Sequence, residues 1–260
     1  MVNIFSFGGG VQSTAALVLA ARGEIDFSIF AFSNVGDDSE SQKTLDYIKA
    51  YSAPYAIAHG LTFLTRRKKW RDGRDETLYQ NVISRNNRSI AIPVKMAGGA
   101  HGNRKCTIEY KIKVIDRLCR ELGSTKTNNS HVGIGISTDE WHRAKESQTP
   151  HITNRHPLLD LNLSRKDCEK IIEESGLPVP PKSSCWYCPF KRKKEWEEMA
   201  TDEPELFQRA VGFEQDINAK REWLGKDPVY LCGTLKPLDQ SFNSPEVAPL
   251  EDDCSGHCWT

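Results

Sequence analysis

The sequence predicts an α/β fold in which a doubly wound, mostly parallel sheet is followed by a small helical subdomain that carries cysteines. Short apolar strands alternate with helical segments through the larger part of the chain, and glycine-rich or polar loops follow the strand ends. A proline-rich stretch at residues 177–181 then precedes a cysteine-rich remainder. We therefore expect an α/β domain over residues 1–178 and a helical subdomain with a flexible tail over residues 179–260.

Composition places the chain among ordinary globular proteins. Its 260 residues can bury one sizeable core, and 38% hydrophobic with 27% charged residues is typical of a protein in aqueous solution. The formal net charge is zero, so attraction of a nucleic acid requires a local basic patch. No apolar run approaches the roughly 20 residues of a membrane span, and no basic-then-apolar leader opens the sequence. We expect a cytoplasmic protein without a membrane partner.

The opening strand leads directly into three glycines and a helix. Residues 4–7 form a short, mostly apolar run, Gly8, Gly9 and Gly10 follow, and Ser13 lies in the first turn of the predicted helix. Glycine lets the backbone approach a ligand closely, and the unpaired N–H groups at a helix start bind anions. The pattern predicts a site for phosphate, pyrophosphate or sulfate. A tight turn capped by serine is the structural alternative.

Two named phosphate motifs are excluded, because no lysine follows the glycines and their spacing is not G-x-G-x-x-G. The pattern Gly-Gly-x-x-Ser-Thr after a first strand resembles the pyrophosphate loop of the ATP-pyrophosphatase, or adenine nucleotide alpha hydrolase-like, superfamily. Gly8 replaces its usual serine and Gln12 its usual aspartate, and glutamine there is similar to phosphoadenylyl-sulfate (PAPS) reductases. The resemblance implies that domain 1–178 binds an adenine nucleotide, ATP or PAPS. The implied residues are Ser6, Gly8, Gly9, Gly10, Gln12, Ser13 and Thr14.

A second strand, residues 26–32, ends in a polar loop, and Ser39 is expected to cap a helix that ends near Pro54. PAPS-reductase-like proteins carry an Asp-Thr-Gly element at this place. The segment from Asn34 to Gly36, with Thr44, resembles a degenerate copy. The resemblance implies contacts to adenosine from Asn34, Gly36 and Asp37. An ordinary capped loop is the alternative.

A later strand, residues 131–136, continues into a segment with two acidic residues and an arginine, a pattern that recurs in relatives of PAPS reductase. Arg143 can grip phosphate or sulfate with two parallel hydrogen bonds, and Lys111 with Arg143 can neutralise developing negative charge. Asp139 and Glu140 together can hold Mg²⁺. A surface pair between the arginine and a glutamate is the alternative for Arg143. We expect Lys111, Arg143 and Asp139 to be catalytic.

Eight cysteines are many for a reducing compartment, where clustered cysteines more often bind metal or do chemistry than form disulfides. Cys119 and Cys168 fall at apolar-periodic positions of predicted helices and are expected in the core. Cys106 lies near a helix start beside two basic residues, which favours the thiolate. Cys185 and Cys188 form a C-x-x-C pair, which is either a metal clamp or a redox pair.

Adenylyl-sulfate reductases resemble this chain in their glycine loop and in the order of their motifs. They hold a [4Fe–4S] cluster with a Cys-Cys pair and a later C-x-x-C. Here the first pair is Lys105-Cys106, so one ligand is missing. The fourth site is either open, as in cluster-dependent tRNA-thiolating relatives, or supplied by Cys254 or Cys258. Structural zinc on four thiolates of the C-x-x-C and the tail is the competing interpretation. The predicted metal ligands are Cys106, Cys185, Cys188 and Cys258.

The tail adds a candidate nucleophile. PAPS reductases end in Glu-Cys-Gly-x-His, whose cysteine attacks the sulfonyl sulfur, and residues 253–257 are a loose match with the glycine displaced by one. The resemblance implies that Cys254 is catalytic.

Two reactions fit these residues. In one, ATP adenylates a nucleobase carbonyl and sulfur then displaces AMP; in the other, an adenylyl sulfate is reduced to sulfite. A non-catalytic nucleic-acid-binding module with a four-cysteine zinc site is the alternative, and it would use Trp70 within the basic run of residues 66–71. The candidate partners are a small-molecule nucleotide, RNA or DNA, a thiol reductant or sulfur donor, and a second copy of the chain.

Overall fold

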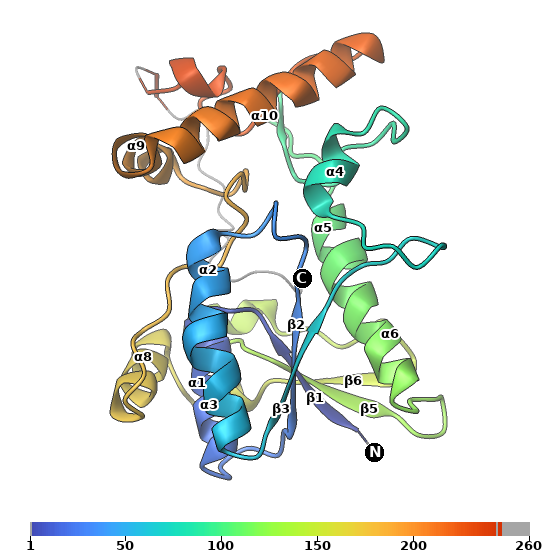
Figure 1. Ribbon diagram of the computed structural model, residues 1–260, viewed down its shortest axis with the longest axis vertical. Helices are drawn as coiled ribbons and strands as arrows, with labels where there is room; N and C mark the ends of the chain where they lie inside the picture. Colours follow the sequence, from blue (N-terminus) through green and yellow to red (C-terminus); the bar gives the residue numbers. More distant parts are fainter. Residues whose placement is uncertain (1, 243, 246–260) are drawn as a thin grey trace.

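The computed structural model describes residues 2–242 and 244–245, and its lower half in Figure 1 is an α/β sandwich around one sheet. The sheet has the strand order β3-β2-β1-β5-β6, and every neighbouring pair in it is parallel. Its strands are β1 (Asn3–Phe7), β2 (Ile29–Ser33), β3 (Thr62–Arg66), β5 (Ser130–Ile134) and β6 (Ile152–Arg155). The predicted parallel α/β fold is confirmed.

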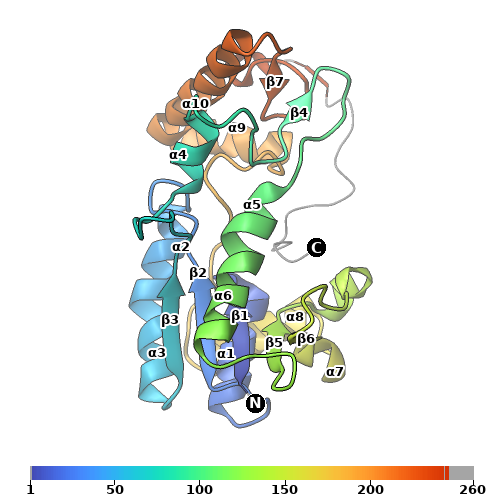
Figure 2. The same ribbon diagram turned by 90° about the vertical axis from the view of Figure 1, so that its right-hand side faces the viewer.

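Helices cover both faces of this sheet, because side chains alternate along each strand. Phe5 and Phe30 point to one face, where they pack with helices α1 (Val11–Ala21), α3 (Ala53–Ala58) and α8 (Arg165–Glu174). Ile4 and Ala31, their neighbours in sequence, point to the other face and pack with α6 (Lys113–Glu121). Figure 2 shows α6 in front of the sheet and α1 and α8 behind it. The apolar alternation in the sequence therefore produces a doubly wound sheet.

The order of the strands fixes where a ligand can bind. From β1 the chain moves outward to β2 and β3, and it later returns to the other side of β1 to form β5 and β6. Between β1 and β5 the two connections leave in opposite directions and open a crevice at the carboxyl ends of the strands. The glycine loop after β1 and the acidic segment after β5 meet at this crevice.

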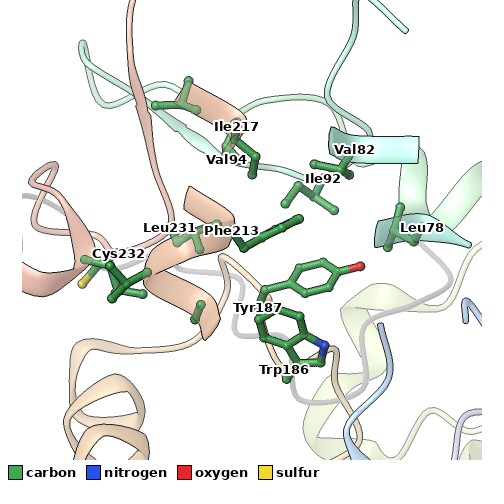
Figure 3. Close-up of a cluster of buried hydrophobic side chains, with 14 of the residues drawn as sticks. Leu78, Val82, Ile92, Val94, Trp186, Tyr187, Phe213, Ile217, Leu231 and Cys232 are labelled. Atoms are coloured by element: carbon green, nitrogen blue, oxygen red, sulfur yellow. The ribbon is translucent and has the colours of Figure 1, made fainter. Parts of the chain in front are cut away.

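A second core lies beyond the carboxyl end of the sheet, in the upper half of Figure 1. It joins α4 (Leu78–Ile83), α9 (Lys193–Asp202), α10 (Pro204–Trp223) and an antiparallel pair formed by β4 (Lys95–Met96) and β7 (Val229–Tyr230). Figure 3 shows Tyr187 and Trp186 packed beneath Phe213 in this cluster. The cluster draws residues from both sides of residue 178, and the domain division at that residue stays a prediction.

Two long helices contain a π-helical turn. Helix α2 (Gln42–Tyr47) continues through η1 (Ile48–Ser52) into α3, so the expected end near Pro54 is wrong. Pro54 lies just after the π-helical turn, at the start of the α3 segment, so the irregular hydrogen bonding of that turn accommodates a residue without an N–H. Helix α5 (Lys105–Thr107) likewise continues through η2 (Ile108–Ile112) into α6. One continuous helix therefore begins beside Cys106 and runs down a face of the sheet.

The remaining elements include one correction. The apolar run at residues 157–161 by itself predicts a short strand or a sheet edge, but the structure has helix α7 (Pro157–Asp160) there, since proline is well suited to a first helical position. The edge strand is β6, before it. Ser164 and Asp167 form a capping box at the start of α8, with Ser164 Oγ 3.2 Å from Asp167 N and Ser164 N 2.9 Å from Asp167 Oδ2. The 3-10 helices are η3 (Thr138–Arg143) and η4 (Leu238–Gln240). None of the helices described is both long and apolar enough for a membrane crossing.

Candidate functional site

The glycine loop, the start of α1 and the end of β5 enclose a small pocket at the sheet crevice, which we call the loop pocket. Arg143 reaches it from η3, and Ser183 reaches it from the segment before the C-x-x-C pair. Its lining residues are Ser6, Gly8, Gly10, Gln12, Ser13, Ile134, Gly135, Ile136, Arg143 and Ser183. The structure thus brings Arg143 to the predicted anion loop from 130 positions away in the sequence.

The loop needs glycine for two different reasons. Gly9 has a φ of +78°, and a Cβ there would lie 2.7 Å from Thr44 Cγ2, so both conformation and packing demand glycine. At Gly8 a Cβ would meet no atom within 4 Å, so the backbone faces open space. Gly135 lets the end of β5 approach α1, since its Cβ would lie 3.3 Å from the backbone nitrogen of Ser13. The loop is therefore packed against the protein at Gly9 and open to the pocket at Gly8.

Several hydrogen-bond donors are left for a ligand. The N-cap of α1 is Gly10, which has no side chain to satisfy the first amides of the helix. Gln12 is only 6% exposed, and its Nε2 has no hydrogen-bond partner within the described residues. Thr14 is fully buried and is not among the described residues that line the loop pocket. Because a buried polar group without a partner costs about 1–3 kcal/mol, an oxyanion in the pocket would be stabilised by these donors.

Arg143 and Glu140 form an ion pair between Nη1 and Oε2 at 2.5 Å, and their side chains are only 4% and 10% exposed. The pair is therefore buried at the loop pocket and does not lie on the surface. Asp139 Oδ2 accepts a hydrogen bond of 2.6 Å from the backbone nitrogen of Arg165, at the start of α8. Both carboxylates have protein partners, and Mg²⁺ binding by this pair stays a prediction.

The predicted adenosine contacts form a closed turn after β2. Asn34 Nδ2 donates to Asp37 Oδ1 at 2.8 Å, and Gly36 N donates to Asn34 Oδ1 at 2.7 Å. The hydrogen bond from Asn34, aided by the guanidinium of Arg67, lowers the pKa of Asp37. Within the described residues, none of Asn34, Gly36 and Asp37 lines the loop pocket. Their contact with adenosine stays a prediction.

Cys106, Cys185 and Cys188 line a second pocket, which we call the thiol pocket, although 79 positions separate the first two in the sequence. All three are half-buried. Arg104 and Lys111 line the same pocket, so Lys111 and Arg143 lie in different pockets. Cys254 and Cys258 lie outside the described residues.

Backbone hydrogen bonds fix the C-x-x-C segment against the loop after β2. Ser41 N donates to Ser184 O at 3.2 Å, and the indole nitrogen of Trp186 donates to Asp38 O at 2.7 Å. Glu40 and Cys185 form an antiparallel bridge between these contacts. On the other wall, Cys106 N donates to Ala91 O at 2.7 Å. Main-chain contacts to distant parts of the chain thus position Cys106 and Cys185, and a local turn places Cys188, whose backbone nitrogen donates to Cys185 O at 3.1 Å.

The two pockets are direct neighbours along one segment. Ser183 lines the loop pocket, and Ser184, the next residue, lines the thiol pocket. A Cβ at Gly10 would lie 2.9 Å from Ser183 Oγ, so this segment presses on the glycine loop. The loop pocket and the thiol pocket therefore meet along residues 183–184.

Within the described residues, no group of three or more His, Cys, Asp or Glu side chains is arranged to hold one metal ion. Cys106, Cys185 and Cys188 share the lining of the thiol pocket with two cations, Arg104 and Lys111. The predicted metal centre, an iron–sulfur cluster or structural zinc, stays a prediction.

The other described cysteines behave as core residues. Burial raises the pKa of Cys119 to about 11 and that of Cys168 to about 12, so both remain protonated thiols near neutral pH. Both side chains are fully buried in the clusters that flank the sheet.

A basic groove lies between β3 and α6. Six cations and three carboxylates are among its lining residues, and Trp70, which is 49% exposed, follows the basic run directly. The cations are Arg66, Arg67, Lys68, Lys69, Lys113 and Arg117; the carboxylates are Asp75, Glu109 and Glu121. The helix that begins beside Cys106 carries Lys113 and Arg117 into this groove, so it connects the groove with the thiol pocket.

Sequence reasoning missed three residues at the crevice: Ser183, Lys182 and Arg165. The last lies in α8, and its Nη1 is 3.3 Å from Gln12 Oε1, across 153 positions of sequence. No local pattern in the sequence signals that contact. The serines before the C-x-x-C pair were visible, but nothing in the sequence indicated that one of them reaches the glycine loop.

No protein-family model matches the sequence, and no curated protein matches it either. Among solved structures, the chain is similar to the U34-tRNA thiolase NcsA from Methanococcus maripaludis with its [4Fe-4S] cluster. The sequence identity is 12%, the TM-score is 0.46, and the match covers 83% of this chain and 72% of that one.

Proposed function

We propose that this chain is an adenine-nucleotide-dependent enzyme of sulfur chemistry, which binds the anionic tail of its nucleotide at the loop pocket and handles sulfur at the thiol pocket. The observation that carries the proposal is the adjacency of the two pockets through Ser183 and Ser184. The arrangement also agrees with the resemblance to PAPS-reductase-like proteins, whose glycine loop follows the first strand.

Each residue then has a physical role. The open amides of the loop and Gln12 Nε2 bind the oxyanion, and Arg143, oriented by Glu140, stabilises the negative charge that develops as the leaving group departs. Lys111 lines the thiol pocket and brings a positive charge to the place where sulfur is handled. A [4Fe–4S] cluster held by Cys106, Cys185 and Cys188 would supply an iron with an open position for sulfur.

Of the two reactions, we favour thiolation of a nucleobase. ATP would adenylate a carbonyl oxygen of the base with release of pyrophosphate, and sulfur would then displace AMP. The basic groove supports a nucleic acid as the acceptor, since its six cations outnumber its three carboxylates and Trp70 can stack on a base. Reduction of an adenylyl sulfate is the second candidate, which the glutamine at position 12 favours through its resemblance to PAPS reductases.

The decisive experiment is anaerobic purification followed by metal analysis and two activity assays. We expect bound iron and sulfide, absorbance near about 400 nm from the thiolate-bound cluster, and pyrophosphate release from ATP in the presence of an RNA or DNA acceptor. Sulfite release from PAPS without pyrophosphate release would favour reduction instead. Bound zinc, with neither activity and no stabilisation by nucleotides, would contradict the enzyme and support the nucleic-acid-binding module.

The acceptor class has a separate test in the salt dependence of binding. We expect the double variant Lys113→Gln and Arg117→Gln to bind RNA or DNA more weakly. The magnitude of the slope of log K against log salt should fall by about 1–2, because fewer counterions are released on binding when two phosphate contacts are lost. Lys170→Gln on α8, outside the groove lining, is the matched control. An unchanged slope in the double variant would contradict the groove as the acceptor site.

A further inference from the structure

A small side pocket adjoins the loop pocket on the side of α8. Gly10, Gln12 and Ser183 line both pockets, so the two spaces adjoin at the first turn of α1. Arg165 and Lys182 line the side pocket but not the loop pocket. Lys182 Nζ donates to both carboxylate oxygens of Glu195, at 2.9 and 3.1 Å. The side pocket therefore adds one cation, Arg165, that faces the predicted anion site without such a bidentate partner.

Arg165 is held in place by three contacts. Its backbone nitrogen donates to Asp139 Oδ2 at 2.6 Å, and its Nη1 donates to Gln12 Oε1 at 3.3 Å. Its Nε lies 3.3 Å from Glu169 Oε1, in a pair whose side chains are both about 40% exposed. Exposed pairs of this kind contribute little, about 0–1 kcal/mol, so the guanidinium can accept a stronger anionic partner.

Gln12 connects the two pockets chemically. Its Oε1 accepts from Arg165, while its buried Nε2 has no partner within the described residues. The contact to Arg165 thus fixes the orientation of the amide and leaves a donor at the boundary between the pockets. A donor at this place is suited to an oxygen that bridges two anionic groups, or to either group beside it.

We infer that Arg165 forms a subsite for the second oxyanion of a phosphoanhydride tail whose first oxyanion binds the glycine loop. This inference rests on the proposed function and deepens it: the ligand has two tetrahedral oxyanions joined by one bridging oxygen. ATP and an adenylyl sulfate both contain such a pair, whereas AMP and inorganic phosphate do not.

The test measures binding of inorganic pyrophosphate and inorganic phosphate by calorimetry to the full-length wild type, Arg165→Gln, Arg165→Lys and Lys166→Gln. We expect Arg165→Gln to weaken pyrophosphate binding about 10- to 100-fold and to leave phosphate within about twofold, because only the longer anion reaches the guanidinium. Arg165→Lys should give an intermediate loss, since it keeps the charge without the planar fork. Lys166→Gln removes the same charge from the same helix end outside the side pocket and should change neither affinity.

ATP and adenosine 5′-phosphosulfate distinguish the two sources of the tail. A loss on Arg165→Gln that is confined to ATP assigns the subsite to a triphosphate, and a loss confined to the phosphosulfate assigns it to a sulfonucleotide. Equal weakening of pyrophosphate and phosphate, or no weakening of pyrophosphate, would overturn the subsite. If the wild type still binds ATP and AMP in that case, the proposed function stands; if it binds no nucleotide at all, both proposals are wrong.

Discussion

The loop pocket and the thiol pocket are neighbours, but they are built in opposite ways. Half of the residues that line the loop pocket come from one short stretch around the three glycines, where strand, turn and helix start are consecutive. The thiol pocket is assembled from Cys106 on a long helix and from a turn that carries Cys185 and Cys188. The first depends on local backbone geometry, and the second depends on how distant elements pack.

This difference has an energetic consequence. The loop pocket is supported by the buried sheet, whereas the thiol pocket is supported by the second core through aromatic contacts such as that of Tyr187 with Phe213, whose ring centroids are 4.3 Å apart. Changes in the second core should therefore disturb the thiols before they disturb the anion site. Three predictions test this separation.

The largest effect is expected at Cys106. Replacing Cys106 with alanine removes one of three thiols, so we expect loss of most of the bound iron, about tenfold or more, with pyrophosphate binding at the loop retained. Metal analysis and calorimetry on the same sample measure the two effects. Cys119→Ala is the control, because that thiol is buried beside the sheet and keeps its proton. Iron retained in Cys106→Ala would exclude Cys106 as a ligand.

A smaller effect concerns the pH dependence of the second core. Glu214 on α10 accepts hydrogen bonds from Leu231 N at 2.6 Å and Leu238 N at 2.7 Å, yet burial raises the pKa of its carboxyl from 4.5 to about 7. Between pH 4.5 and about 7 the folded protein holds a proton that the unfolded chain has released. The contribution of Glu214 to the free energy of unfolding therefore falls as pH rises through this window, by roughly 3 kcal/mol at most.

Urea unfolding of the wild type and Glu214→Gln at several pH values measures this contribution. We expect the variant to be less stable at acidic pH, because an amide cannot accept from both backbone nitrogens, and to show a flatter slope of stability between pH 5 and about 7. Glu222→Gln, exposed on the same helix, is the control. Parallel slopes in the wild type and Glu214→Gln would contradict a raised pKa for Glu214.

The sequence predicts features that depend on local backbone geometry better than features that depend on the packing of distant elements. The parallel fold and the glycine loop were predictable, because alternation, turn residues and helix starts are local signals. The presence of Arg143 at the loop pocket and of Cys106 opposite the C-x-x-C agrees with the prediction, although their roles stay predictions. The sequence predicts that Lys111 and Arg143 act together, but the structure places Lys111 in the thiol pocket. The pocket that Lys111 lines depends on how its helix packs, and no local sequence pattern determines that packing.

The errors have equally specific causes. Pro157 signals a helix start as readily as a strand edge, and the choice depends on whether a neighbouring strand offers hydrogen bonds. Arg165 was missed because its contact with Gln12 joins two helices whose packing no short pattern encodes. Functional residues supplied by non-local contacts are thus the ones that required the structure.

The last prediction separates stability from binding within the loop itself. Gly9→Ala forces a φ of +78° and a contact of 2.7 Å with Thr44 Cγ2, so we expect it to lower the free energy of unfolding by about 1–3 kcal/mol. Gly8→Ala meets no atom within 4 Å, so stability should change by less than about 0.5 kcal/mol. Its methyl group nevertheless faces the space where we place the anion, and pyrophosphate affinity should fall. Calorimetry with chemical unfolding of both variants gives the two quantities. Unchanged pyrophosphate affinity in a stable Gly8→Ala protein would mean that no anion lies against the backbone at Gly8, the position where the resembling loops usually carry a serine.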